Sequence, residues 1–211
     1  MKNSRKVLLI IVLALVTMTL FVASVNVAKT VSDDFDFGSD ATCSVLVEYY
    51  GYYNGERVTI PFVQAPWSIN NVVVDSLGVN ISWVCSGQYM KWDTLAIVGT
   101  LKLYWLNYYG VNPTDITSNV GASTAYSRTG VTAKTGSAVF IIPLSALLSG
   151  VSASGVTSAG VSYWTIRAET TVSGTCTDDY NKAWSDATGL LKATYTIYDA
   201  AAGFSISGVI K

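Results

Sequence analysis

The feature that most constrains the fold of this chain is a two-residue alternation of apolar and polar side chains. It is clearest in Thr94–Trp105, where the apolar residues lie two positions apart rather than three and four apart. Successive side chains of a strand point to opposite faces of a sheet, so this period predicts a strand with one buried face. Gly99 lies inside the pattern and indicates a bulge or a close crossing by another segment.

Similar short segments fill most of the chain after residue 42. Asn54-Gly55, the strongest short hairpin signal, connects Cys43–Tyr53 to Arg57–Val63. Leu77-Gly78 is interpreted as a separator between two further strands. The remaining predicted strands are Val72–Asp75, Ile81–Cys85, Ala138–Ile142, Val161–Val172, Leu190–Tyr198 and Phe204–Ile210.

Helical signals are weak by comparison. Pro143–Leu148 predicts one helical turn, with Gly150 as its stop, and the uncharged Ser149–Gly160 predicts a surface loop. Because many short strands alternate with turn signals and no long helix is predicted, the fold class is all-β. We expect a single β-sandwich or jelly-roll domain.

The N-terminus carries an export signal. Met1–Lys6 is basic, and Val7–Val25 follows without a charged residue. Such a segment is either a signal peptide, which we expect to be cut between residues 24 and 32, or a retained membrane anchor. The sequence thus predicts an extracellular or cell-surface protein that touches a membrane only through this segment. We divide the chain into a leader or anchor (1–28), an extended tail (29–41) and a β-sandwich domain (42–211).

The tail directly behind the leader also alternates with period two. Its odd positions carry Val27, Val31, Phe35 and Phe37, which we predict to be subunit-interface residues. An apolar strand near a chain end can add to the sheet of a neighbouring copy, and this is our leading interpretation. The alternative is an ordinary first strand of the chain's own sandwich, because sheet edges have to be covered in some way. In that case the prediction of a polymer loses its basis.

Charge and histidine content exclude several function classes. Charged residues make up 13 % of the 211 residues, the formal net charge is −1, and histidine is absent. Without a basic surface we expect no nucleic-acid partner, and without histidine no Ser-His-Asp or Cys-His catalysis. Glu48 and Glu169 are the best candidates for a hydrolytic carboxylate pair, but ordinary surface pairing explains them better, so we predict no enzyme. The low charge favours a surface covered by neighbouring copies or glycans over a quiet soluble domain.

Three cysteines, Cys43, Cys85 and Cys176, are the disulfide candidates. In an oxidising compartment we expect one bridge and one remaining thiol, and the sequence does not choose among the three pairings. Three buried, unpaired thiols are the alternative.

Two further sites are suggested by short patterns. Asp34, Asp36 and Asp40 cluster around a glycine, and clustered carboxylates on a turn are candidate calcium ligands, although ordinary polar turns explain them as well. No other cofactor is predicted. Asn80 begins the one intact glycosylation sequon, so a glycan is expected there.

In its leader, its alternating tail Val27–Phe37 and its single all-β head, the chain resembles secreted surface filament subunits of archaea, the threads and bundling pili. The resemblance implies that each subunit lacks one strand and receives it from its neighbour. It implies a structural subunit of an extracellular filament whose partner is another copy of itself. A carbohydrate-binding or adhesive surface domain, and a membrane-anchored envelope or virion coat protein, are the alternatives.

Overall fold

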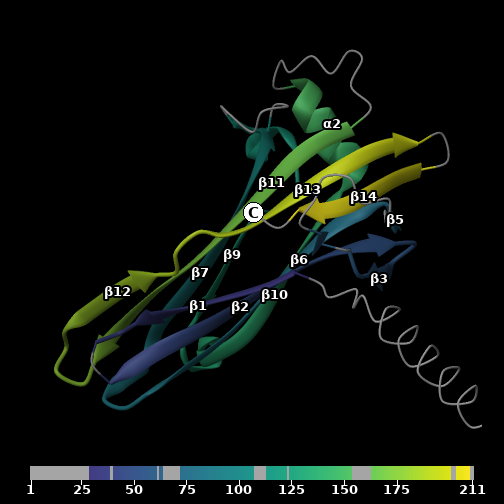
Figure 1. Cartoon of the computed structure of the whole chain (residues 1–211). Coiled ribbons are helices and arrows are strands. Elements are labelled where there is room, and N and C mark those ends of the chain that lie inside the picture. The colour runs from purple at the N-terminus through teal and green to yellow at the C-terminus, as the bar shows by residue number, and fades with distance from the viewer. Residues whose placement is uncertain are drawn as a thin grey trace, which may run out of the picture.

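The computed structural model describes residues 29–38, 40–60, 62–63, 72–106, 113–122, 124–153, 163–200 and 203–209. These residues form two β-sheets that pack as a sandwich, with one α-helix among them near the upper end of the view (Figure 1). The all-β sandwich predicted from the sequence is therefore confirmed. The leader, residues 1–28, lies outside the described residues. In the part of the chain that is described, no helix combines the length and apolar character needed to cross a membrane.

The smaller sheet has the strand order β1-β2-β6-β10, and all of its pairings are antiparallel. Its strands are β1 (Lys29–Asp36), β2 (Ala41–Tyr53), β6 (Ser76–Gly87) and β10 (Thr135–Pro143), with the short β3 (Glu56–Val58) paired to one end of β2. Strands β1 and β10 are consequently the two edges of this sheet.

The larger sheet has the order β4-β14-β13-β11-β7-β8, with β12 paired to β11, β5 to β14 and β9 to β7. Its strands are β4 (Phe62–Val63), β5 (Val72–Val74), β7 (Met90–Leu106), β8 (Thr114–Asp115), β9 (Ala125–Thr129), β11 (Tyr163–Asp178), β12 (Ala183–Ala187), β13 (Leu191–Ala200) and β14 (Gly203–Val209). The connections contain the 3-10 turns η1 (Thr117–Asn119) and η2 (Val131–Lys134) and the helix α2 (Leu144–Ala153). The long central strands β7 and β11 give the head its elongated shape (Figure 1).

The core fills the space between the two sheets. On β7 the leucines and the isoleucine of the predicted alternation are fully buried, and Trp105 at its end is half-buried. Across the interior, the Tyr49 hydroxyl of β2 donates to the Leu191 carbonyl at 2.7 Å and so ties the smaller sheet to the larger one. Each large apolar side chain buried here contributes about 1.5–3 kcal/mol to stability.

Gly99 lies in a regular part of β7, paired with Tyr126 of β9 and Val172 of β11 without a shift in register, so the predicted bulge or close crossing is not found there. A Cβ built on Gly99 would lie 1.8 Å from Cε1 of Tyr126, because the side chain of this register partner occupies the space above the glycine. The same ring stacks on Trp83, with 5.3 Å between ring centroids. The glycine therefore makes room for an aromatic pair that closes one side of the sandwich.

The predicted hairpin at Asn54-Gly55 is confirmed, since Tyr53 pairs with Glu56 and both turn residues have positive φ angles of 52° and 81°. The prediction of one strand over Arg57–Val63 is wrong. Strand β3 ends at Val58, and β4 instead joins the larger sheet parallel to β14. The sequence carries Pro61 between them, and proline has no amide hydrogen to donate to a ladder.

Two other predicted boundaries are also wrong. Leu77-Gly78 does not separate strands but lies within β6, where Gly78 leaves space for the ring of Tyr50, 2.5 Å from the position a Cβ would take. The predicted helical turn extends to Ala153, and Gly150 lies inside α2 against Val120 rather than ending it.

Candidate functional site: the groove that holds β1

The predicted interface strand forms the first edge of the smaller sheet. Strand β1 pairs with β2 along its whole length, from Lys29 opposite Tyr49 to Asp36 opposite Thr42. Its odd-numbered side chains point inward and its even-numbered ones are exposed, which is the alternation that the sequence predicted. In this chain, then, β1 completes its own sheet, the alternative reading of the tail.

Phe35 and Phe37 anchor the strand in the core. Their exposed fractions are 2 % and 1 %, and their rings meet edge to face with centroids 5.3 Å apart. Both rings lie on Gly174 of β11, where a Cβ would come within 2.6 Å of either ring. We call the space beside β2 that β1 fills the groove, and Gly174 of β11 is its floor. This floor accepts two aromatic side chains because glycine has no Cβ there.

The turn after β1 is short and is packed by Trp184. The Phe37 amide donates to the Ala41 carbonyl at 2.7 Å, and Gly38 has a φ of 88°. A Cβ at Gly38 would lie 2.9 Å from the ring of Trp184, so glycine serves both the left-handed backbone and the close approach. The Trp184 indole in turn donates to Asp178 at 3.0 Å, and this bond is the main reason that the pKa of Asp178 is lowered.

Carboxylates connect β1 to the larger sheet on the side away from β2. The Asp36 amide donates to Asp186 at 3.0 Å, and the Gly189 amide donates to Asp33 at 2.7 Å. The bond from the Asp36 amide is the largest cause of the lowered pKa of Asp186. These contacts form the rim of the groove and hold the strand from its outer edge.

The other predicted interface residues differ in how they are placed. Val31 is half-buried and packs against the core from β1. Val27 lies outside the described residues. Of the predicted interface residues, Phe35 and Phe37 are thus the two that fill the groove.

The predicted calcium ligands are not brought together. Asp34 and Asp36 are on the exposed side of β1, and Asp40 follows in the turn. Among the residues that the structure describes, no three carboxylate or thiol groups are arranged to hold a metal ion. The neighbouring carboxylates of Asp33 and Asp186 instead accept hydrogen bonds from backbone amides, and we propose no metal site here.

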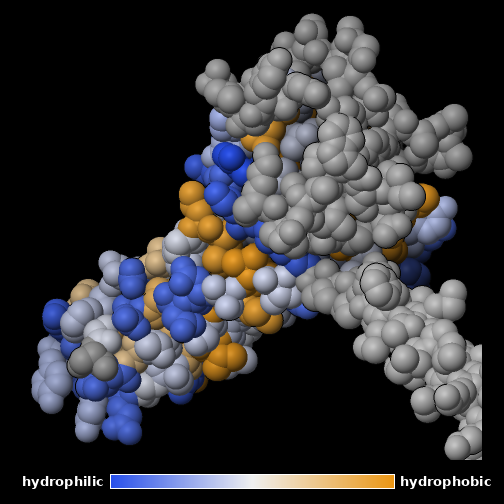
Figure 2. Space-filling model, in the orientation of Figure 1, coloured by the Kyte–Doolittle hydropathy of each residue, from blue (hydrophilic) through white to orange (hydrophobic). Residues whose placement is uncertain are grey.

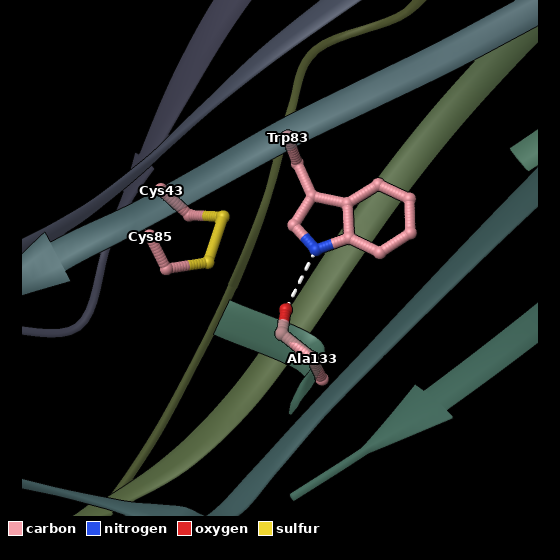
Figure 3. Close-up of a disulfide and its surroundings, with 4 residues drawn as sticks. All are labelled: Cys43, Trp83, Cys85 and Ala133. Atoms are coloured by element: carbon pink, nitrogen blue, oxygen red, sulfur yellow. Dashed lines mark hydrogen bonds between the residues drawn. A yellow bond between two sulfur atoms is a disulfide. The ribbon is translucent and has the colours of Figure 1, made fainter. Parts of the chain in front are cut away.

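Cys43 and Cys85 form the disulfide, and Cys176 is a buried free thiol. The bridge joins register partners on β2 and β6, and it lies beside Trp83, whose indole donates to the Ala133 carbonyl at 2.7 Å (Figure 3). Burial raises the pKa of the Cys176 thiol. The sequence prediction of one bridge and one remaining thiol is confirmed, and a disulfide is typical of proteins in an oxidising compartment.

Asn80 and the glutamates lie on outer faces of the sandwich. Asn80, the predicted glycan site, is a half-buried residue of β6 whose amide donates to Glu48 at 2.8 Å, and Glu48 also pairs with Arg57 at 3.1 Å. Glu169 bonds Arg167 at 2.8 Å on the outer face of the larger sheet. Glu48 and Glu169 thus face opposite sides of the molecule and do not form a pair across a cleft.

Comparison with known proteins finds no matching family model, no similar curated protein and no similar solved structure. The groove and its strand are therefore interpreted from their own geometry.

Proposed function

We propose that the protein is an exported structural subunit that builds an extracellular filament by exchanging β1 between copies. Because β1 completes its own sheet, the proposal cannot rest on a missing strand. It rests on the position of β1, an edge strand at the start of the head that leads to two phenylalanines lying on Gly174. The strand precedes the other described strands of the head, and the Phe37 amide bonds the Ala41 carbonyl where the chain returns into β2. Without β1 the head exposes the floor at Gly174 and the open edge of β2.

Exchange keeps every contact that β1 makes in its own chain. The same strand from a neighbouring copy presents Phe35 and Phe37 to the same floor. It also makes the same bonds at the rim, donating from the Asp36 amide and accepting at the Asp33 carboxylate. Strand exchange between copies costs little beyond opening the hinge, because the pairings lost in one chain are regained in the other. A head that accepts the strand of one neighbour and donates its own to the next generates a linear polymer.

The compartment agrees with this role. The disulfide indicates an oxidising environment, and the basic and apolar leader sequence predicts export. The low content of charged residues suits a surface that is covered by other copies, and Figure 2 shows apolar side chains among hydrophilic ones on the visible face of the head. The likeness to archaeal threads and bundling pili belongs to this proposal.

A cysteine pair across β1 and β2 tests the exchange. Ser32 and Leu46 are register partners with outward side chains. Because the Asp36 amide points away from β2, the even-numbered residues of β1 face β2 as non-hydrogen-bonded pairs, whose Cβ atoms are close enough for a disulfide. We expect the variant S32C/L46C, secreted and oxidised in assembled form, to give a ladder of covalent multimers on a non-reducing gel.

The matched control is V84C/T135C, whose register partners lie on β6 and β10 and never leave the head. This variant should run as a single monomer band whether or not β1 is exchanged. A monomer band alone from S32C/L46C, with no multimers above the control, would show that β1 stays in its own chain and would end the filament proposal.

A carbohydrate-binding or adhesive surface domain is the second candidate, favoured by two tyrosines at one end of the head. Tyr89 and Tyr180 are 57 % and 83 % exposed, and the Asp179 amide donates to the Tyr89 carbonyl at 2.8 Å, which holds their two turns together. Tyr89 has a φ of 59°, an unusual backbone state for an aromatic residue.

If these two tyrosines stack on sugars, Y89A/Y180A should lose at least about 90 % of retention on the polysaccharide that the native protein binds, since each stacked ring contributes about 1 kcal/mol. A native protein that no polysaccharide column retains would contradict this candidate.

A further inference from the structure

The second edge of the smaller sheet, β10, has a row of backbone groups that point away from the sheet. In an antiparallel strand, the N–H and C=O of alternate residues face the same neighbour. The Leu144 amide donates to the Asp75 carbonyl at 2.8 Å and continues the ladder between β10 and β6, so the even-numbered residues of β10 face β6. The amides and carbonyls of Thr135, Ser137, Val139 and Ile141 therefore face outward.

No strand in the described ranges covers this edge, since β6 is the one strand there that pairs with β10. The side chains of the same four residues lie on the solvent side of the sheet, and Val139 and Ile141 are 48 % and 51 % exposed. The strand has the sequence TGSAVFIIP and carries no charge. Uncharged edge strands with exposed apolar residues are templates for pairing with another chain.

The opposite edge of the same sheet is blocked. Strand β1 carries three aspartates, and the outward amides of Asp34 and Asp36 are occupied by the carboxylates of Asp33 and Asp186. Charged residues and capped amides on an edge strand prevent unwanted pairing. Among the described strands, the sheet is thus protected at the β1 edge and unpaired at the β10 edge.

We propose that β10 pairs with β10 of a second copy of this chain, antiparallel about a twofold axis. A twofold interface brings the same surface of two copies together, so each charge in it would meet its own like charge. Strand β10 has no charged residue, so two copies of it can pair without like charges meeting. Antiparallel pairing centred on Val139, the middle residue of β10, joins the two smaller sheets into one. It places the two copies of Val139 opposite each other on one face, with Ile141 of each copy next to them.

This pairing does not depend on the exchange of β1, because the two strands lie at opposite edges of the sheet. If both occur, β10 links two filaments side by side. If only β10 pairs, the protein is a dimer.

The test compares V139K with V84K in the secreted, purified protein. Both valines are exposed on the same face of the smaller sheet, but Val84 lies on the central strand β6 and Val139 on the edge. Two lysines facing each other across the twofold axis should raise the dissociation constant at least about tenfold. We expect light scattering of V139K to give half the native mass of the unmodified protein and V84K to leave the mass unchanged. In filaments, we expect V139K to separate paired filaments into single ones in electron micrographs.

Hydrogen exchange of the unmodified protein gives a second measurement that needs no variant. Paired, the outward amides of Val139 and Ile141 should exchange at least about 100-fold more slowly than unprotected amides. Fast exchange at both positions, or an equal mass of native protein and V139K, would overturn the proposal. Loss of association in V84K as well would assign the contact to the sheet face instead of the edge. A multimer ladder from S32C/L46C together with fast exchange at Val139 rejects the β10 pairing and leaves the exchange of β1 intact. A monomer band from S32C/L46C together with slow exchange at Val139 rejects the exchange of β1 alone.

Discussion

Replacing Phe35 with alanine is expected to lower the free energy of unfolding of the head by about 3–5 kcal/mol. The side chain is 2 % exposed and fills the space above Gly174 and beside Phe37, so its removal leaves a cavity that the rigid β11 backbone cannot close. Denaturant unfolding of the secreted protein, followed by tryptophan fluorescence, measures the change.

The control for this variant is S32A, which truncates an exposed side chain of the same strand and should change the free energy of unfolding by no more than about 0.5 kcal/mol. The effect of F35A is the same whether β1 fills its own groove or that of a neighbour, because the lost contacts are identical. A loss below about 1 kcal/mol for F35A would show that the phenylalanine does not occupy the groove.

Opening the disulfide is expected to destabilise the head by about 4 kcal/mol. Cys43 and Cys85 are 42 positions apart, and a cross-link of this span removes a corresponding loop-closure entropy from the unfolded chain. Thermal unfolding of the double variant C43A/C85A, compared with the oxidised native protein, measures the loss as a fall in Tm.

Here the control is C176A, which removes the buried free thiol and tests the cost of a small cavity alone. We expect a loss of about 1–2 kcal/mol for it, close to the usual value for deleting a small buried group. If C43A/C85A were no less stable than C176A, the bridge would contribute nothing beyond packing.

Much of the fold could be predicted because period two is a local property. The alternation in Thr94–Trp105 identified β7, and Asn54-Gly55 identified the hairpin between β2 and β3. Glycines within strands were harder to interpret, because their role depends on which side chain of a neighbouring strand packs against them. Gly99 and Gly78 each lie under a tyrosine ring from another strand, and a glycine within a strand reads much like a turn when the neighbouring strand is not known.

The groove could be predicted only in part for the same reason. The pattern of the tail identified Phe35 and Phe37 as residues of a buried face. Its floor and rim come from Gly174 and Asp186, about 140–150 positions away along the chain, and no local signal connects them to β1. Strand β12, which provides Asp186, was not predicted at all, since Ala183–Ala187 has no apolar alternation.

The cysteine pairing followed from register rather than from spacing. Three pairings were open in the sequence, and only the alignment of β2 with β6 places Cys43 opposite Cys85. Similarly, the sequence predicted a strand at Ala138–Ile142 but not its position at the edge of a sheet, which depends on the order of all four strands.

One row across the smaller sheet also bears on mechanical strength. Phe35 of β1 lies opposite Cys43, which lies opposite Cys85 on β6. A pull along the axis of β1 loads its ladder with β2 in shear, so that many hydrogen bonds have to break together. The force then passes through a covalent link into the middle of the sheet, and β2 cannot be peeled from β6 under tension while that link is intact.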